Sequence, residues 1–174
     1  MSCLNAIALF KSFSGNIQGT VHFHQCSDQS GTHVDIDLHN IQPGKIHAIH
    51  IHEHGDEREG CISLGGHWNP TIKTHGSLFL GMPSHSGDMI NNIKGNSKGK
   101  FKYAYHDPRI NLRGDVNDSI IGRSVVIHQG NDDLGLGGMD PYNPHVRRES
   151  LKTGNAGKRM ACSIIGRAMD GPLI

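Results

Sequence analysis

Residues 33–53 read HVDIDLHNIQPGKIHAIHIHE, and their pattern points to the fold class. From His33 to His39, polar and apolar residues alternate strictly, which is typical of a strand with one buried face. Pro43-Gly44 then predicts a turn, and the run from Ile46 to Glu53 predicts a second strand. The stretch therefore indicates a β protein.

Short apolar-rich runs of the same kind continue on both sides of this stretch. They predict further strands at 4–11, 17–25, 101–105, 120–128 and 159–168, and no segment predicts a convincing helix. Many short strands separated by turn signals favour an antiparallel barrel or sandwich. Residues 55–100 and 129–158 are long, Gly-rich connections, and loops of that length in a compact domain are usually functional.

Length and charge narrow the class of protein. A chain of 174 residues predicts a single domain over residues 1–174. The net charge is +1 with both signs interspersed, so we expect no nucleic-acid or membrane partner. The first residues, MSCLNAIALFK, have no basic region before their short apolar run, so we expect no secretory signal and a cytoplasmic protein.

The histidines carry the chemistry. His50 and His52 are two apart on a predicted strand, so their imidazoles share one face and can bind one ion, whereas His47 should face away. His54 lies beside a glycine where the strand should end. An HxH pair alone is a weak signal, and two solvated histidines remain the alternative.

A stronger group follows in the first long loop. His67, His75, His85 and Asp88 offer three imidazoles and one carboxylate, which is a complete tetrahedral zinc shell. The alternative is a polar loop that happens to be rich in histidine. His128 ends a later strand, and a single histidine there is more often structural than a ligand.

Several long segments together resemble copper/zinc superoxide dismutases of the cytosolic type. The segments are HAIHIHEHGD, GCISLGGHWNP, HSGD, SIIGRSVVIH, DDLGLGG and KTGNAGKRMAC, in family order along essentially the whole chain. The resemblance implies an all-β fold, an eight-stranded antiparallel Greek-key barrel (an immunoglobulin-like sandwich) with two long functional loops.

The resemblance also assigns roles to residues of this chain. It implies one copper ion held by His50, His52, His67 and His128, and one zinc ion held by His67, His75, His85 and Asp88. Asp132 would hydrogen-bond the copper ligand His50 and the zinc ligand His75. His67 and Arg159 would act in catalysis, the arginine by attracting the anion, and Cys61 and Cys162 would form a disulfide.

The implied activity is the conversion of two superoxide anions and two protons to O2 and H2O2 through alternating Cu(II) and Cu(I). The alternative is a non-catalytic relative that sequesters metal or binds a copper chaperone. The family pairs as homodimers, which we expect here too, although His54 and Arg167 stand where apolar interface residues are common. Lys158 and Met160 replace prolines typical of chaperone-dependent members, so a copper chaperone is a possible partner that is not required.

Three further features depart from the family pattern. Residues 139–149 form a longer segment that carries Arg147 and Arg148 where acidic residues are typical. Residues 76–84 are more apolar than usual and are expected to pack on the barrel or on a partner. Cys3 and Cys26 have no family role, and we expect small buried or half-buried thiols there.

Overall fold

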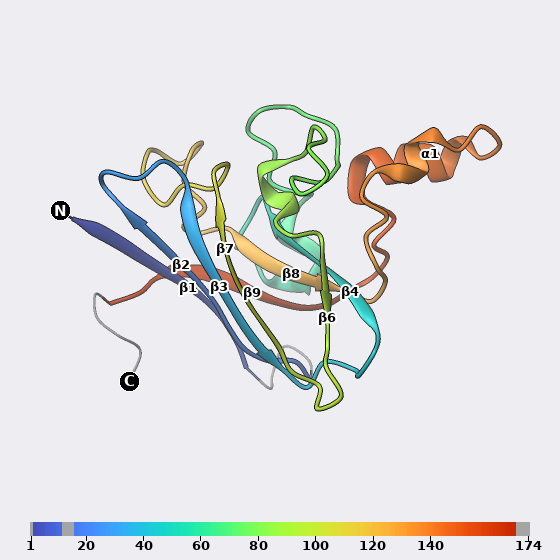
Figure 1. Ribbon diagram of the computed structural model, residues 1–174. Coiled ribbons are helices and arrows are strands. Elements are labelled where there is room, and N and C mark those ends of the chain that lie inside the picture. The colour runs from blue at the N-terminus through green and yellow to red at the C-terminus, as the bar shows by residue number, and fades with distance from the viewer. Residues whose placement is uncertain (1, 12–15, 170–174) are drawn as a thin grey trace.

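A computed structural model describes residues 2–11 and 16–169 of the chain. Eight antiparallel strands form one sheet in the order β6-β4-β8-β9-β1-β2-β3-β7, which curls into a nearly closed barrel (Figure 1). The all-β prediction is therefore confirmed. The bounds of the sheet strands are β1 (Cys3–Phe10), β2 (Gln18–Cys26), β3 (Thr32–His39), β4 (Ile46–His52), β6 (Asn92–Lys94), β7 (Phe101–Asp107), β8 (Ser124–His128) and β9 (Arg159–Arg167).

Alternation of residue type gives the barrel its interior. In β3, Val34, Ile36 and Leu38 are buried, while the polar residues between them face outward. The neighbouring strands β1 and β2 contribute buried residues such as Phe10 and Phe23 in the same way. Strands that are distant in sequence pair as β3–β7, β4–β8 and β1–β9, so long connections of the Greek-key type cross the barrel ends.

The first long loop is more ordered than its composition indicated. It contains a short strand, β5 (Arg58–Cys61), two 3-10 turns (Ile62–Leu64 and Ser86–Asp88) and the sheet strand β6. A three-residue strand has too few positions to show an alternating pattern, so the prediction of a continuous loop over 55–100 missed it. The loop lies over β4 at one end of the barrel (Figure 1, green).

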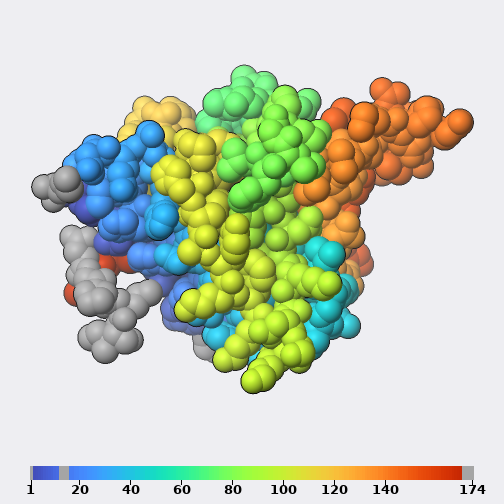
Figure 2. All heavy atoms as spheres, viewed as in Figure 1, coloured from blue at the N-terminus to red at the C-terminus, as the bar shows by residue number. Residues whose placement is uncertain are grey.

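The prediction that the chain has no helix was wrong. The helix α1 (Pro144–Thr153) lies in the second long loop and projects from the barrel (Figures 1 and 2, orange). Asn143 caps it by accepting hydrogen bonds from the backbone N–H groups of His145 and Val146, both at 3.1 Å. Ser150 is its buried residue, so the helix has no apolar stripe from which its period could be read.

The expectation of free thiols at Cys3 and Cys26 was also wrong. The two residues are directly opposed on β1 and β2 and form a disulfide. A second disulfide joins Cys61, at the end of β5, to Cys162 in β9. Among the residues described, no helix combines the length and the apolar character needed to cross a membrane.

Candidate metal centre

Strands β4 and β8 place three histidines on one side of the sheet. His50 and His52 alternate with Ile49 and Ile51, which point into the core, so both imidazoles face the loops outside the barrel. The pairing of β8 with β9 shifts register between Ile127 and His128, at the end of the strand. His67 enters from the first long loop, where it forms an isolated bridge with His52.

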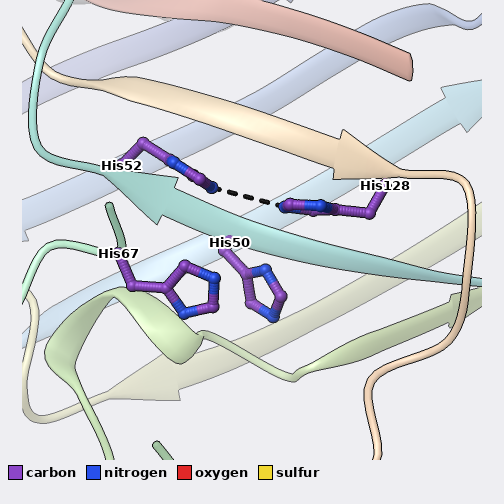
Figure 3. A group of neighbouring side chains, drawn as sticks. All are labelled: His50, His52, His67 and His128. Carbon is purple, nitrogen blue, oxygen red and sulfur yellow. Dashed lines mark hydrogen bonds between the residues drawn. The ribbon is translucent and has the colours of Figure 1, made fainter. Parts of the chain in front are cut away.

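These four histidines form one compact group (Figure 3). Each offers a ring nitrogen, and the four nitrogens lie within 4.8 Å of one another in buried surroundings. His52 Nε2 and His128 Nε2 are 3.3 Å apart, and the ring centres of His50 and His67 are 3.9 Å apart. Four convergent imidazoles are a donor set suited to Cu(II).

The outer nitrogens of three rings are tied to the protein. His50 donates from Nε2 to Asp132 Oδ2 at 2.7 Å, His52 from Nδ1 to the carbonyl of Gly65 at 3.0 Å, and His128 from Nδ1 to the carbonyl of Gly157 at 3.1 Å. Each bond fixes the tautomer that leaves a lone pair on the inward nitrogen. His50 Nδ1 and His67 Nε2 are buried and have no hydrogen-bond partner among the described residues, which fits a metal at this point.

A second group converges on one oxygen of Asp88. The Nδ1 atoms of His67, His75 and His85 lie 2.9, 2.9 and 3.1 Å from Asp88 Oδ1. A tetrahedron with metal–ligand distances of about 2.0 Å has edges of about 3.3 Å, so the three nitrogens lie about as far from Asp88 Oδ1 as zinc ligands lie from one another. The other oxygen of Asp88 accepts backbone N–H bonds from Gly76 at 3.2 Å and from His85 at 2.8 Å.

Asp132 connects the two groups. Its Oδ2 accepts the Nε2–H of His50 at 2.7 Å, and its Oδ1 accepts the Nε2–H of His75 at 2.9 Å. Asn91 donates to Oδ2 at 3.1 Å, and Asn92 bonds both the backbone N–H and the carbonyl of Asp132. The carboxylate thus orients one ligand of each metal.

Burial sets the protonation state of the four histidines of the first group, His50, His52, His67 and His128, called the copper group below. It lowers the pKa of His50 and of His128 to about 4 and that of His67 to about 3. Burial likewise holds the pKa of His52 well below its usual value. All four rings are therefore neutral at neutral pH, the state in which imidazole binds metal.

The second group, His67, His75, His85 and Asp88, is called the zinc group below. It contains charged side chains before a metal binds. Burial opposes protonation of His75, but the Asp132 and Asp88 carboxylates on its two nitrogens outweigh burial and raise its pKa to about 9. Burial would raise the pKa of Asp88, but hydrogen bonds from His67, His75 and His85 lower it far below its usual range. Zinc binding at neutral pH must therefore displace a proton from His75 Nδ1.

A pocket of about 320 Å³ opens onto the copper group. His52, His67 and His128 line this pocket, and so does Arg159. The Arg159 guanidinium donates to the carbonyls of Cys61 at 2.6 Å and Ile62 at 3.1 Å, and to that of Gly65. The remaining lining residues are Gly66, Glu149, Thr153, Asn155, Ala156 and Gly157.

Several residues of the centre were not expected from sequence. Asn91 and Asn92 hold Asp132, while Glu149 and Thr153 of α1 line the pocket. A lone asparagine or a polar helix face carries no ligand signature, so no motif could have indicated them. His47, in agreement with its parity, lies outside both metal groups; it bonds the carbonyl of His128 at 2.8 Å through Nδ1.

Comparisons with known proteins agree with this geometry. The family described as copper/zinc superoxide dismutase (SODC) matches residues 17–165. The chain is 41% identical over 167 residues to a superoxide dismutase [Cu-Zn] of Paramecium bursaria Chlorella virus 1, covering 96% of this chain and 80% of that protein. It is 42% identical over 163 residues to the superoxide dismutase [Cu-Zn] of Saccharomyces cerevisiae, covering 94% and 97%.

Two further similar proteins are an extracellular enzyme and a protein of known structure. An extracellular superoxide dismutase [Cu-Zn] of Brugia pahangi is 44% identical over 160 residues, which cover 92% of this chain and 74% of that protein. The crystal structure of the clock protein EA4 superposes with a TM-score of 0.79 at 35% identity, covering 94% of each chain. With both ligand sets complete, the chain belongs to the copper/zinc superoxide dismutase family.

Proposed function

We propose that the chain, acting as a single domain, converts two superoxide anions and two protons to O2 and H2O2. The observation that carries this proposal is a pair of complete, buried ligand sets that share His67 and are joined by Asp132. Copper, when bound, supplies the redox chemistry by exchanging one electron with each superoxide, and zinc supplies none.

We assign proton transfer to His67. The second superoxide must gain two protons before it leaves as H2O2. His67 lines the pocket, and its buried Nε2 has no hydrogen-bond partner among the described residues. Its Nδ1 stays 2.9 Å from Asp88 Oδ1, so the ring keeps its orientation while Nε2 gains or loses a proton.

Arg159 is assigned to anion attraction. Its side chain lines the pocket, and three backbone carbonyls accept its hydrogen bonds and hold it in place. A fixed positive charge beside a small opening raises the encounter rate of an anion by about ten- to a thousandfold. Glu149 lines the same pocket from α1, whereas Arg147 and Arg148 do not.

The function is tested by pulse radiolysis on samples whose copper and zinc contents are measured. We expect fast decay of superoxide in proportion to copper content, slowed by added salt because the encounter is electrostatic. Protein with full copper and zinc and no turnover would contradict the proposal and favour the metal-sequestering alternative.

We infer that the chain pairs with a second copy across β1, β5 and β9. A hollow of about 650 Å³ opens there, lined by Ile7, Leu9 and Ile164 among others. Leu9 is 45% exposed and Ile164 is 41% exposed, and pairing would remove this apolar surface from water. Sedimentation equilibrium should find a dimer for the native chain and a monomer for Ile164→Asp; a dimer of unchanged strength would contradict the inference.

Two finer points also rest on the sequence. We propose that copper loading does not require a chaperone, because Lys158 and Met160 stand where prolines are typical of dependent members. Expression in cells that lack the chaperone should yield active protein, and inactive, disulfide-reduced protein would contradict this. We further propose a cytoplasmic location. One relative is described as extracellular, so cell fractionation is the test that separates the two locations.

A further inference from the structure

A third group of metal-ligating side chains lies on the outer face of the β1–β2 pair, apart from the copper and zinc groups. Cys3 and Cys26 are directly opposed in register, with Cα atoms 3.9 Å apart. His24 stands two residues before Cys26 on the same face of β2. The ligand atoms of Cys3, His24 and Cys26 lie within 4.8 Å of one another, and all three residues are half-buried.

His24 is oriented in the manner of a metal ligand. Its Nδ1–H donates to Asn5 Oδ1 at 2.8 Å, across the rung of the ladder that pairs Asn5 with His24. The bond leaves a lone pair on Nε2, which points at Cys26 Sγ from 3.2 Å. A carbonyl-type acceptor on the outer nitrogen is the usual arrangement behind a metal-bound imidazole. Cys61 and Cys162 belong to no such group in the described part of the chain.

We propose that Cys3, His24 and Cys26 form a third metal site, for a thiophilic cation of the Zn(II) or Cu(I) type, when the Cys3–Cys26 disulfide is reduced. Two thiolates and one imidazole are a donor set that selects these cations. Their half-buried positions leave a further coordination position open to water. In the oxidised protein a disulfide links Cys3 to Cys26, and in the reduced protein a metal ion links the same two residues.

The exchange balances chemically. A dithiol reductant gives two electrons and two protons to the disulfide and becomes a cyclic disulfide, leaving two thiols at Cys3 and Cys26. Each thiol releases its proton when its sulfur binds the cation. Hydrogen peroxide restores the bridge, since two thiols and one H2O2 give one disulfide and two water molecules.

The test uses the copper- and zinc-loaded protein under anaerobic conditions. After treatment with dithiothreitol and its removal, alkylation with peptide mapping identifies the open cysteines. Co(II) is added as a probe to a separate, unalkylated portion of the reduced protein, and the thiolate-to-cobalt charge-transfer absorption is recorded. We expect one equivalent of Co(II) bound through thiolate per chain in the reduced protein and none in the untreated disulfide form. Displacement of Co(II) by Zn(II), and competition for Cu(I) with a chromophoric chelator, distinguish the two cations.

Variants separate the site from nonspecific thiol binding. Cys26→Ser and Cys3→Ala should each abolish the absorption while retaining the copper and zinc of the main centre. Asn5→Ala should weaken Co(II) binding about 10- to 100-fold because His24 loses its outer partner. His33→Asn is the matched control, because His33 pairs with His24 across the sheet but lies outside the group, and it should leave binding unchanged.

Three results would overturn the proposal. One is a pair that resists a reductant able to open Cys61–Cys162. Another is two open thiols at Cys3 and Cys26 without the absorption. The third is an absorption of equal strength in Cys26→Ser.

Discussion

Gly154 closes α1 at a point where any side chain would enter the hydrogen bond between His75 and Asp132. The residue has φ 64°, and its N–H donates to the carbonyl of Ser150. A Cβ atom there would lie 2.5 Å from His75 Nε2 and closer still to Asp132 Oδ1. Gly154→Ala should therefore separate the imidazole of a zinc ligand from the carboxylate that orients it.

The cost of Gly154→Ala has two parts. The left-handed backbone conformation costs about 1–2 kcal/mol for alanine at any such position. Loss of the outer partner of His75 should weaken zinc binding about 10- to 100-fold, or about 1.4–2.7 kcal/mol. Copper binding should change by less than about threefold, because His50 bonds the other carboxylate oxygen, Oδ2.

Gly81→Ala supplies the matched control. Gly81 has φ 66° and lies between the zinc ligands His75 and His85, but a Cβ there would meet nothing within 4 Å. It bears the same backbone strain without the clash, so its zinc affinity should stay within about threefold of the native value. Zinc and copper affinities are measured by chelator competition on metal-free protein with its disulfides intact. Equal zinc affinity in the two variants, or a copper loss as large as the zinc loss in Gly154→Ala, would refute the reasoning.

Three other predictions concern charge, covalent linkage and pH. Arg159→Ala should lower the rate constant for superoxide decay at low salt about tenfold or more, whereas Lys158→Ala, outside the pocket lining, should not; equal effects in pulse radiolysis would count against the assignment. Cys162→Ser should lower the free energy of unfolding in urea by about 4–5 kcal/mol, since the bridge spans a separation of 101 residues, and a loss below about 1 kcal/mol would contradict this. The metal-free protein should be most stable near pH 6.5. Below that pH the unfolded chain binds protons that the folded chain does not, because buried His50, His67 and His128 have pKa values of about 4, 3 and 4. Stability therefore falls as the pH is lowered. Above it, the stabilisation from protonated His75 is lost as the pH rises through about 9. A free energy of unfolding in urea that increases from pH 6.5 toward pH 4 would disprove the account.

Regular periodicity made most of the barrel predictable. The alternation of residues 33–39 predicted β3 (Thr32–His39) to within one residue, and β4 and β9 were placed equally closely. The β-branched run from Ile120 was an overestimate, because Gly122, at φ 86°, turns the chain before β8 begins at Ser124. Local pattern fixes strands well where one face is buried and poorly where a turn lies within an apolar run.

The metal centre was predictable to the extent that its ligands are chemically distinctive. The parity of His50 and His52 indicated a pair, and the donor set from His67 to Asp88 indicated zinc without reference to any relative. Joining His128 to the first pair required the pairing of β4 with β8, which no local pattern contains. For that residue the family resemblance supplied what the spacing could not.

Contacts between residues that are distant in the chain could not be predicted from the sequence. The helix α1 is stabilised by its cap and by Asp133, which bonds Ser150 Oγ at 2.9 Å, rather than by an apolar face. The Cys3–Cys26 bridge depends on the register of β1 against β2, which brings the two residues face to face. Register is set by the whole sheet, so the separation of 23 residues gives no indication of it.

Asp132 has a thermodynamic consequence beyond orienting two rings. One carboxylate restrains a ligand of each metal, so the two ligand sets share a structural element through which the occupancy of one can act on the other. Linkage then requires reciprocity: whatever factor zinc contributes to copper affinity, copper must contribute to zinc affinity. The two binding free energies therefore belong to one thermodynamic cycle, and the order in which the ions arrive changes the route of assembly but not its final free energy.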